Sequence, residues 1–287
     1  KIRSVDTEGI FANWCHYGYM ASLPAQLLNE MSFDPAPDIE AELHSLAVRN
    51  YGPQSAPLVV RAWRHLSDGI REFPYSDNVS RIPGPLQKGP SHPFFLDPKI
   101  PNFGRWRSWQ NDLAWTKPWG PAVAAKYLGK VRAEFVKGAA LLDEARTASQ
   151  GKHREALDAE WRIATLLESS LATVLHLIDW IEARSRFYGA QSDSERAAAA
   201  RELESVLIAE RANVQRVLPL LEADSRLGYA SEGGGVLRGG LFTPELVRWK
   251  LGQIDNVLRV ELPRLSGRSA AAVPSTIREA VAGASRN

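Results

Sequence analysis

HREALDAEWRIATLLESSLATVLHLIDWIEARSRF, residues 153–187, is the stretch of sequence that determines the predicted fold class. Apolar side chains recur in it about every 3.5 residues, the spacing of one face of a helix. They are Leu157, Trp161, Ala164, Leu167, Leu171, Leu175, Ile178 and Ile181. A stripe of this length predicts one long helix that buries a face against neighbouring helices.

The flanking segments show the same kind of pattern. Residues 121–149 are rich in Ala, Leu, Lys and Glu, and residues 194–223 repeat Leu and Val at helical spacing. Short polar breaks such as Gln150-Gly151 separate the segments, which favours antiparallel packing of consecutive helices. We therefore predict a mainly α fold, an antiparallel bundle of long helices. Thr243-Pro244-Glu245 predicts the start of one more helix, which runs to about Leu262.

Two shorter helices are predicted before the long ones. Asp38 is a plausible N-cap for a helix that Asn50-Tyr51-Gly52-Pro53 ends, and a second helix is predicted from Pro53 to Pro74. Residues 83–121 then hold eight of the 18 prolines and four of the nine tryptophans. A disordered linker is poor in aromatics, so this composition predicts a long ordered loop packed on the body.

The N-terminal part reads differently from the helical remainder. Residues 9–14 form a short apolar run that predicts one buried strand, the only strand we expect. Because an isolated strand leaves its backbone groups unpaired, either another chain or a missing part of this protein should pair with it. We expect residues 1–37 to end a separate domain, residues 38–265 to form the helical domain, and residues 266–287 to be a weakly structured tail.

Composition and motifs argue against several functional classes. With 35 basic and 33 acidic residues the net charge is +2, too small to favour nucleic acid, and no apolar run reaches the length of a membrane span. The six histidines lack metal-ligand spacing, and phosphate-loop, dinucleotide and serine-elbow motifs are missing from the sequence. We therefore expect neither a metal nor a cofactor. Cys15 and His16 would point to opposite faces of a strand, which disfavours a nucleophile–base pair.

The aromatic segment after the predicted strand is the strongest candidate site. Asn13-Trp14-Cys15-His16-Tyr17-Gly18-Tyr19 offers apolar rings that stack on the C–H face of a sugar, together with polar groups for its hydroxyls. The alternative is a packed aromatic corner. The loop 82–95, with Gln87, Lys88 and His92, borders a pocket or is a rigid cover. Glu232 lies in a glycine-flanked loop and is a candidate ligand contact, whereas Asp224 and Arg226 favour a structural ion pair.

Several of these pieces resemble one family. Gly9 to Tyr19, followed by Ser22-Leu23-Pro24, resembles the end of the last strand of a bacterial (β/α)8-barrel glycoside hydrolase of the hexosaminidase-like group. The further pieces that resemble it are Tyr51-Gly52, Ala62-Trp63-Arg64-His65-Leu66-Ser67, Phe73-Pro74-Tyr75, Gly84-Pro85-Leu86-Gln87-Lys88-Gly89-Pro90 and Asp224-Ser225-Arg226-Leu227-Gly228-Tyr229. The resemblance implies that the other barrel strands and the catalytic carboxylates lie upstream of this chain.

The resemblance assigns roles to the candidate residues. Trp14 would stack on a sugar, Asn13, His16 and Tyr17 would bind its hydroxyls, and Glu232 would close the rim. The chain would then be part of an exo-acting glycoside hydrolase that acts on a carbohydrate, with its catalytic residues elsewhere. The alternative is a non-enzymatic helical protein that binds a partner or forms a homo-oligomer through residues 9–24 and the tryptophan-rich loop.

Overall fold

The computed structural model describes residues 23–33, 38–76, 79, 85–100, 111–225, 227 and 243–267. Within these ranges the chain is mainly helical and forms no strand, which confirms the predicted mainly α class. The strand predicted at residues 9–14 lies outside the described residues, as does the tail from residue 268.

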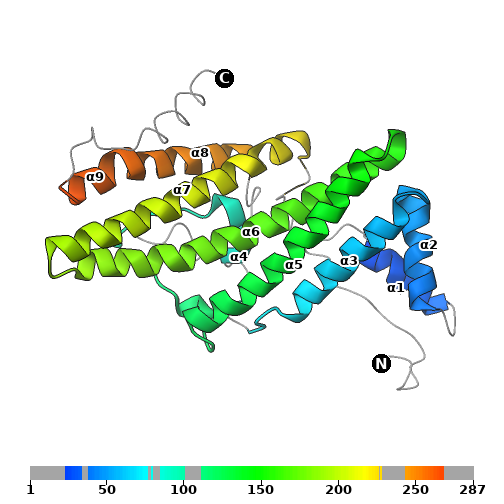
Figure 1. Cartoon of the computed structure of the whole chain (residues 1–287), viewed down its shortest axis with the longest axis horizontal. Coiled ribbons are helices and arrows are strands. Elements are labelled where there is room, and N and C mark those ends of the chain that lie inside the picture. Colours follow the sequence, from blue (N-terminus) through cyan, green and yellow to red (C-terminus); the bar gives the residue numbers. More distant parts are fainter. Residues whose placement is uncertain are drawn as a thin grey trace, which may run out of the picture.

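The helices follow one another along the chain, some with short connections and others separated by longer segments such as residues 89–120 (Figure 1). Their bounds are α1 Leu23–Phe33, α2 Ile39–Tyr51, α3 Ala56–Arg71, α4 Pro85–Lys88, α5 Pro121–Thr147, α6 Gly151–Gly189, α7 Asp193–Ala223, α8 Pro244–Asn256 and α9 Leu262–Leu265. Two 3-10 turns occupy Gly89–Ser91 and Ala114–Thr116, and a π-helical turn, Val257–Glu261, joins α8 to α9.

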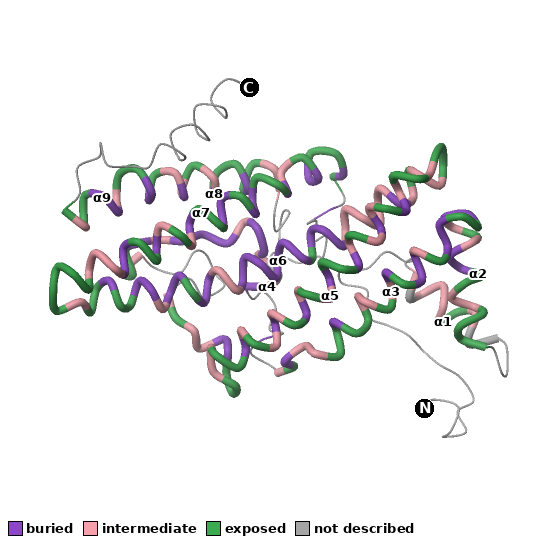
Figure 2. Tube along the Cα trace, viewed as in Figure 1, coloured by how far each residue is buried: buried purple, intermediate pink, exposed green. Residues whose placement is uncertain are grey.

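The long helices lie side by side, each antiparallel to the next. Helix α6 lies between α5 and α7, α3 packs on the far side of α5, and α8 packs on α7 (Figure 1). Burial is greatest along α6, because neighbours cover it on both sides (Figure 2). The antiparallel arrangement predicted from the short polar breaks is therefore present among these helices.

Helix α6 buries more than the predicted apolar stripe. Ser169, Ser170 and Thr173 are buried beside Leu171, whereas Leu167, which belongs to the predicted stripe, is exposed. The helix is covered by different neighbours along its length, so its buried face shifts away from a single 3.5-residue stripe. By length and composition α6 could also cross a membrane, but 72% of its most apolar window is buried inside the fold, as is typical of a core helix.

Capping residues explain where several helices begin. The Asp38 carboxylate accepts a hydrogen bond from the Glu40 amide at 2.9 Å, and the Thr243 hydroxyl accepts one from the Leu246 amide at 3.3 Å. Both predicted starts are therefore confirmed. The helix predicted to begin at Pro53 instead begins at Ala56, because residues 53–55 form a turn.

Helix α1 was not predicted, and it packs on α2. Arg49 of α2 pairs with Glu30 of α1 at 3.2 Å, and the Asn50 amide lies 3.4 Å from the Gln26 side-chain oxygen. Part of the segment 1–37, expected to belong to a separate domain, is thus in contact with the helical body.

The proline- and tryptophan-rich segment packs on the bundle in its described parts, 85–100 and 111–120. Phe94, Leu96 and Trp115 are buried, and Trp106 and Trp109 lie outside the described residues. The Gln253 side chain holds the Phe94 backbone at both ends, since it accepts from the Phe94 amide at 3.2 Å and donates to the Phe94 carbonyl at 2.6 Å. This segment is thereby fixed to α8.

Candidate functional site

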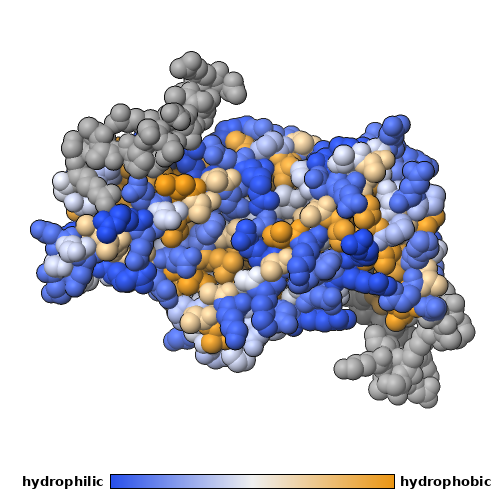
Figure 3. Space-filling model, viewed as in Figure 1, coloured by the Kyte–Doolittle hydropathy of each residue, from blue (hydrophilic) through white to orange (hydrophobic). Residues whose placement is uncertain are grey.

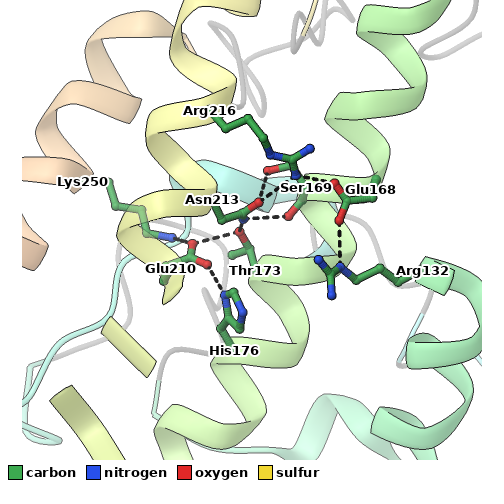
Figure 4. A network of polar contacts seen from close by, with 9 residues as sticks. All are labelled: Arg132, Glu168, Ser169, Thr173, His176, Glu210, Asn213, Arg216 and Lys250. Carbon is green, nitrogen blue, oxygen red and sulfur yellow. Dashed lines mark hydrogen bonds and ion pairs between the residues drawn. The ribbon is translucent and has the colours of Figure 1, made fainter. Parts of the chain in front are cut away.

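A network of nine polar residues runs through the core between α5, α6, α7 and α8 (Figure 4). We call it the central network. Its centre is Glu210 of α7, which is fully buried. The carboxylate contacts the equally buried Lys250 ammonium of α8, accepts a hydrogen bond from the Thr173 hydroxyl at 2.8 Å and lies 2.7 Å from His176 Nδ1. Three helices are therefore tied to a single carboxylate.

The network continues from Thr173 towards the surface. Asn213 donates from its amide nitrogen to Thr173 Oγ1 at 3.1 Å, and its oxygen accepts from the Ser169 hydroxyl at 2.9 Å. Arg216 contacts both this oxygen and Glu168, and Arg132 of α5 donates to the other Glu168 oxygen at 2.8 Å. Figure 4 shows the resulting path of contacts, which crosses the bundle from the two arginines to Lys250.

The buried charges of the central network are paired with one another. Burial opposes ionisation of Glu210, but Lys250 and the hydrogen bond with His176 outweigh it and hold the pKa of the carboxyl below its usual value. Burial also lowers the pKa of the Lys250 ammonium, so burial opposes the charge on both groups and each group favours the ionised form of its partner. We interpret the central network as a lock that fixes α8 on α6 and α7, because its buried polar groups already have partners.

A second, partly buried carboxyl has a different environment. Glu160 of α6 accepts a hydrogen bond from the Trp63 indole N–H of α3 at 3.2 Å and one from the Tyr51 hydroxyl of α2 at 3.3 Å. The two rings meet edge-on, with centroids 6.0 Å apart. We call these three residues the Glu160 cluster. Tyr51 is buried, whereas Glu160 and Trp63 are each partly exposed.

The Glu160 cluster has no cation among the described residues. Burial raises the pKa of the Glu160 carboxyl, and the hydrogen bonds from Trp63 and Tyr51 only partly oppose this. Asp158, half a turn earlier on α6, contrasts with it, because both Arg146 and Arg154 pair with Asp158 at 3.1 and 3.0 Å. Carboxyls whose pKa is shifted by burial are enriched at functional sites. The Glu160 cluster is therefore the candidate site of the helical body.

The residues nominated from the sequence lie elsewhere in the chain. Asn13, Trp14, His16, Tyr17 and Glu232 all fall outside the described residues, so the structure neither brings them together nor separates them. In the described part, groups of three or more His, Cys, Asp or Glu able to hold a metal are absent.

The loop 82–95 is closer to a rigid cover than to a pocket wall in its described part. His92 is fully buried, with its Nδ1 3.1 Å from the Pro93 carbonyl oxygen. The backbone of Gly89 lies so close to α6 that a β-carbon there would be 2.5 Å from the Ser170 hydroxyl. Lys88 is partly exposed, and burial lowers its pKa. Asp224 is buried, while Arg226, its predicted partner, lies outside the described residues.

Sequence reasoning missed both carboxyl sites. For the central network a signal existed, because Ser169, Thr173 and His176 follow helical spacing within the longest helix and so mark a polar stripe on a buried face. No such signal exists for the Glu160 cluster. Tyr51 and Trp63 lie 109 and 97 residues from Glu160 in sequence, and only the packing of α2 and α3 on α6 joins them.

Trp161 packs against residues that are close in sequence to the two candidate segments, residues 13–19 and the segment with Glu232. It packs against the hydrophobic cluster that also receives Leu23, the first described residue after the aromatic segment. It also packs against the cluster that contains Leu227 and Val247, which in sequence precede and follow the segment with Glu232 that lies outside the described residues. Trp161 directly follows Glu160, so the Glu160 cluster lies in this same region.

Comparisons with known proteins gave no match: neither a protein-family model, nor a curated protein, nor a solved structure is similar to this chain at a significant level.

Proposed function

We propose that this chain is the C-terminal part of a carbohydrate-active enzyme, an exo-acting glycoside hydrolase, in which the helical body supports a sugar site. In this proposal Trp14 stacks on the sugar, while Asn13, His16 and Tyr17 bind its hydroxyls and Glu232 closes the rim. The catalytic carboxylates lie outside the chain, in a barrel domain that pairs with residues 9–14.

One observation carries the proposal. Tyr51 and Trp63 come from two separate pieces of sequence that carry the family resemblance, and both donate hydrogen bonds to the same carboxyl of Glu160. Leu23, which follows the aromatic segment, packs against the hydrophobic cluster that includes Tyr51 and Trp63. Tyr51, Trp63 and Leu23 belong to separate pieces of sequence that carry the resemblance, and they lie in one region of the fold. Their proximity supports the proposal that these pieces form one site.

The helical body suits a supporting role. Its central network ties α5, α6, α7 and α8 together through paired charges, of which Glu210 and Lys250 are fully buried, and this restricts relative movement of the helices. Helices α7 and α8, which border the segment with Glu232, are therefore held at fixed positions. Substrate-binding groups need a rigid support of this kind to keep productive geometry.

The experiment is an activity screen of the product of the complete gene, including any segment upstream of Lys1, against aryl glycosides of several sugars. We expect release of the aryl group from at least one of them. Trp14→Ala should raise KM, whereas Trp119→Ala, at an exposed tryptophan remote from this segment in sequence, should leave KM unchanged. Absence of turnover with every glycoside, together with a structure that places Trp14 in a dry core, would contradict the proposal.

A second candidate function, assembly into a homo-oligomer, is favoured by a different observation. Leu246, Trp249 and Val260 lie on one face of α8 and the turn that follows, and they are 41%, 44% and 56% exposed. Apolar residues also gather into patches on the face seen in Figure 3. Such patches are typical of interaction surfaces. Sedimentation of the purified chain tests this candidate: a dimer that Val260→Glu dissociates would support it, and a monomer at all concentrations would exclude it.

A further inference from the structure

The hydrogen bonds to Glu160 leave part of its carboxylate unused. An ionised carboxylate offers about four acceptor positions on its two oxygens. Trp63 occupies one position on Oε1 and Tyr51 one on Oε2. Two acceptor positions therefore remain, and since Glu160 is partly exposed a ligand can reach the residue from outside.

The surroundings of these positions are aromatic and uncharged. Ion pairs of the described residues do not include Glu160, and Trp63, which donates to it, is partly exposed. A neutral ligand with hydroxyl donors and an apolar face fits this combination, because the carboxylate accepts from a hydroxyl while the ring contacts the C–H face. Asp158 on the same helix differs, because it is paired with two cations, Arg146 and Arg154.

We propose that the Glu160 cluster is a sugar-binding subsite, in which the Glu160 carboxylate accepts a hydrogen bond from a sugar hydroxyl and Trp63 contacts the sugar ring. Tyr51 is a positioning residue, since its buried hydroxyl holds one carboxylate oxygen. The inference rests on the proposed function, because it assigns to the helical body a contact with the same class of substrate that Trp14 would stack on.

The test uses nuclear magnetic resonance of the complete chain with ¹⁵N-labelled tryptophan. The indole N–H signals of Trp63 and Trp14 are assigned from their disappearance in Trp63→Phe and Trp14→Phe. The probes are the methyl glycosides of glucose, galactose, mannose and N-acetylglucosamine, each titrated separately. Because the Trp63 N–H is bound to Glu160, we expect its signal to move in a saturable way with at least one probe.

Two variants separate a binding role from a structural one. Glu160→Gln should weaken the apparent affinity about tenfold, the effect of losing one hydrogen bond to a charged group. Asp158→Asn, a matched change on the same helix, should leave the affinity within about twofold, because Asp158 only pairs with arginines. If Glu160→Gln does not fold, Tyr51→Phe takes its place with an expected loss of about threefold.

The two tryptophan signals test the inference and the proposed function separately. A Trp63 signal that no probe moves overturns the inference, as does a shift of equal affinity in the wild type and Glu160→Gln. If the Trp14 signal moves while that of Trp63 does not, the inference fails and the proposed function stands. If the Trp63 signal moves and that of Trp14 does not, the subsite is supported and the role of Trp14 is refuted.

Discussion

Replacing Lys250 with methionine tests the electrostatic account of the central network. Lys250→Met keeps most of the side-chain volume and removes the ammonium group, which is fully buried against the Glu210 carboxylate and lies 4.5 Å from the centre of the Phe94 ring. The remaining Glu210 charge keeps the Thr173 hydroxyl at 2.8 Å and His176 at 2.7 Å. Leaving a buried charge without its ion partner costs about 3–5 kcal/mol, a large share of the stability of an ordinary domain.

The cost should depend on pH through the Glu210 carboxyl itself. The pKa of Glu210 is depressed in the folded chain, so its stabilising contribution is present above the unfolded carboxyl value and is lost only as the pH falls through the depressed value. Lys250 is the main group that opposes the effect of burial, so its removal should raise the pKa of Glu210. The carboxyl of the variant can then take up a proton at low pH and lose its unpaired charge, so we expect a smaller loss at about pH 5.5 than at about pH 8.

The assay is urea unfolding followed by helical circular dichroism, at both pH values. The double variant Glu210→Gln with Lys250→Met should recover more than half of the loss, because it removes the unpaired charge. The control is Arg248→Met on the same helix, where the arginine is half-exposed and pairs with Glu222; its effect should stay within about 0.5 kcal/mol. A loss below about 1 kcal/mol at pH 8, or a double variant as unstable as the sum of its parts, would refute this account.

Three further changes test the packing, the caps and the second carboxyl. Gly138→Ala should cost about 1–3 kcal/mol in urea unfolding, because its β-carbon would lie 2.9 Å from a Leu66 methyl, whereas Gly129→Ala on the same helix has open space and should be neutral or stabilising. Asp38→Ala should cost about 1 kcal/mol through loss of the α2 cap, and Asp38→Asn should restore most of it. Because burial raises the pKa of Glu160, its stabilising contribution is present below the usual value of 4.5 and is lost as the pH rises through the raised value. The stability of the wild type relative to Glu160→Gln should therefore fall over that interval, and a flat difference would argue against the raised pKa.

The helices are the part of the fold that could be predicted from sequence. Their apolar spacing, the caps at Asp38 and Thr243 and the breaks at glycine and proline act over a few residues, so they can be read from adjacent letters. The sequence predictions failed where contact with another helix determines burial or secondary structure. Leu167 fits the stripe of α6 but is exposed, because the helices that cover α6 change along its length. Helix α1 lacks a strong local signal and packs on α2.

What the sequence determined by itself is the mainly helical class and the order of the long helices, since both follow from the periodicity of single segments. Only the tertiary structure decided which polar residues meet. Glu210 and Lys250 lie on different helices, and so do Glu160, Tyr51 and Trp63, and nothing in the local spacing of either group connects its members. A carboxyl acquires its function from its distance to charges and from its burial, and both are set only when distant helices pack together.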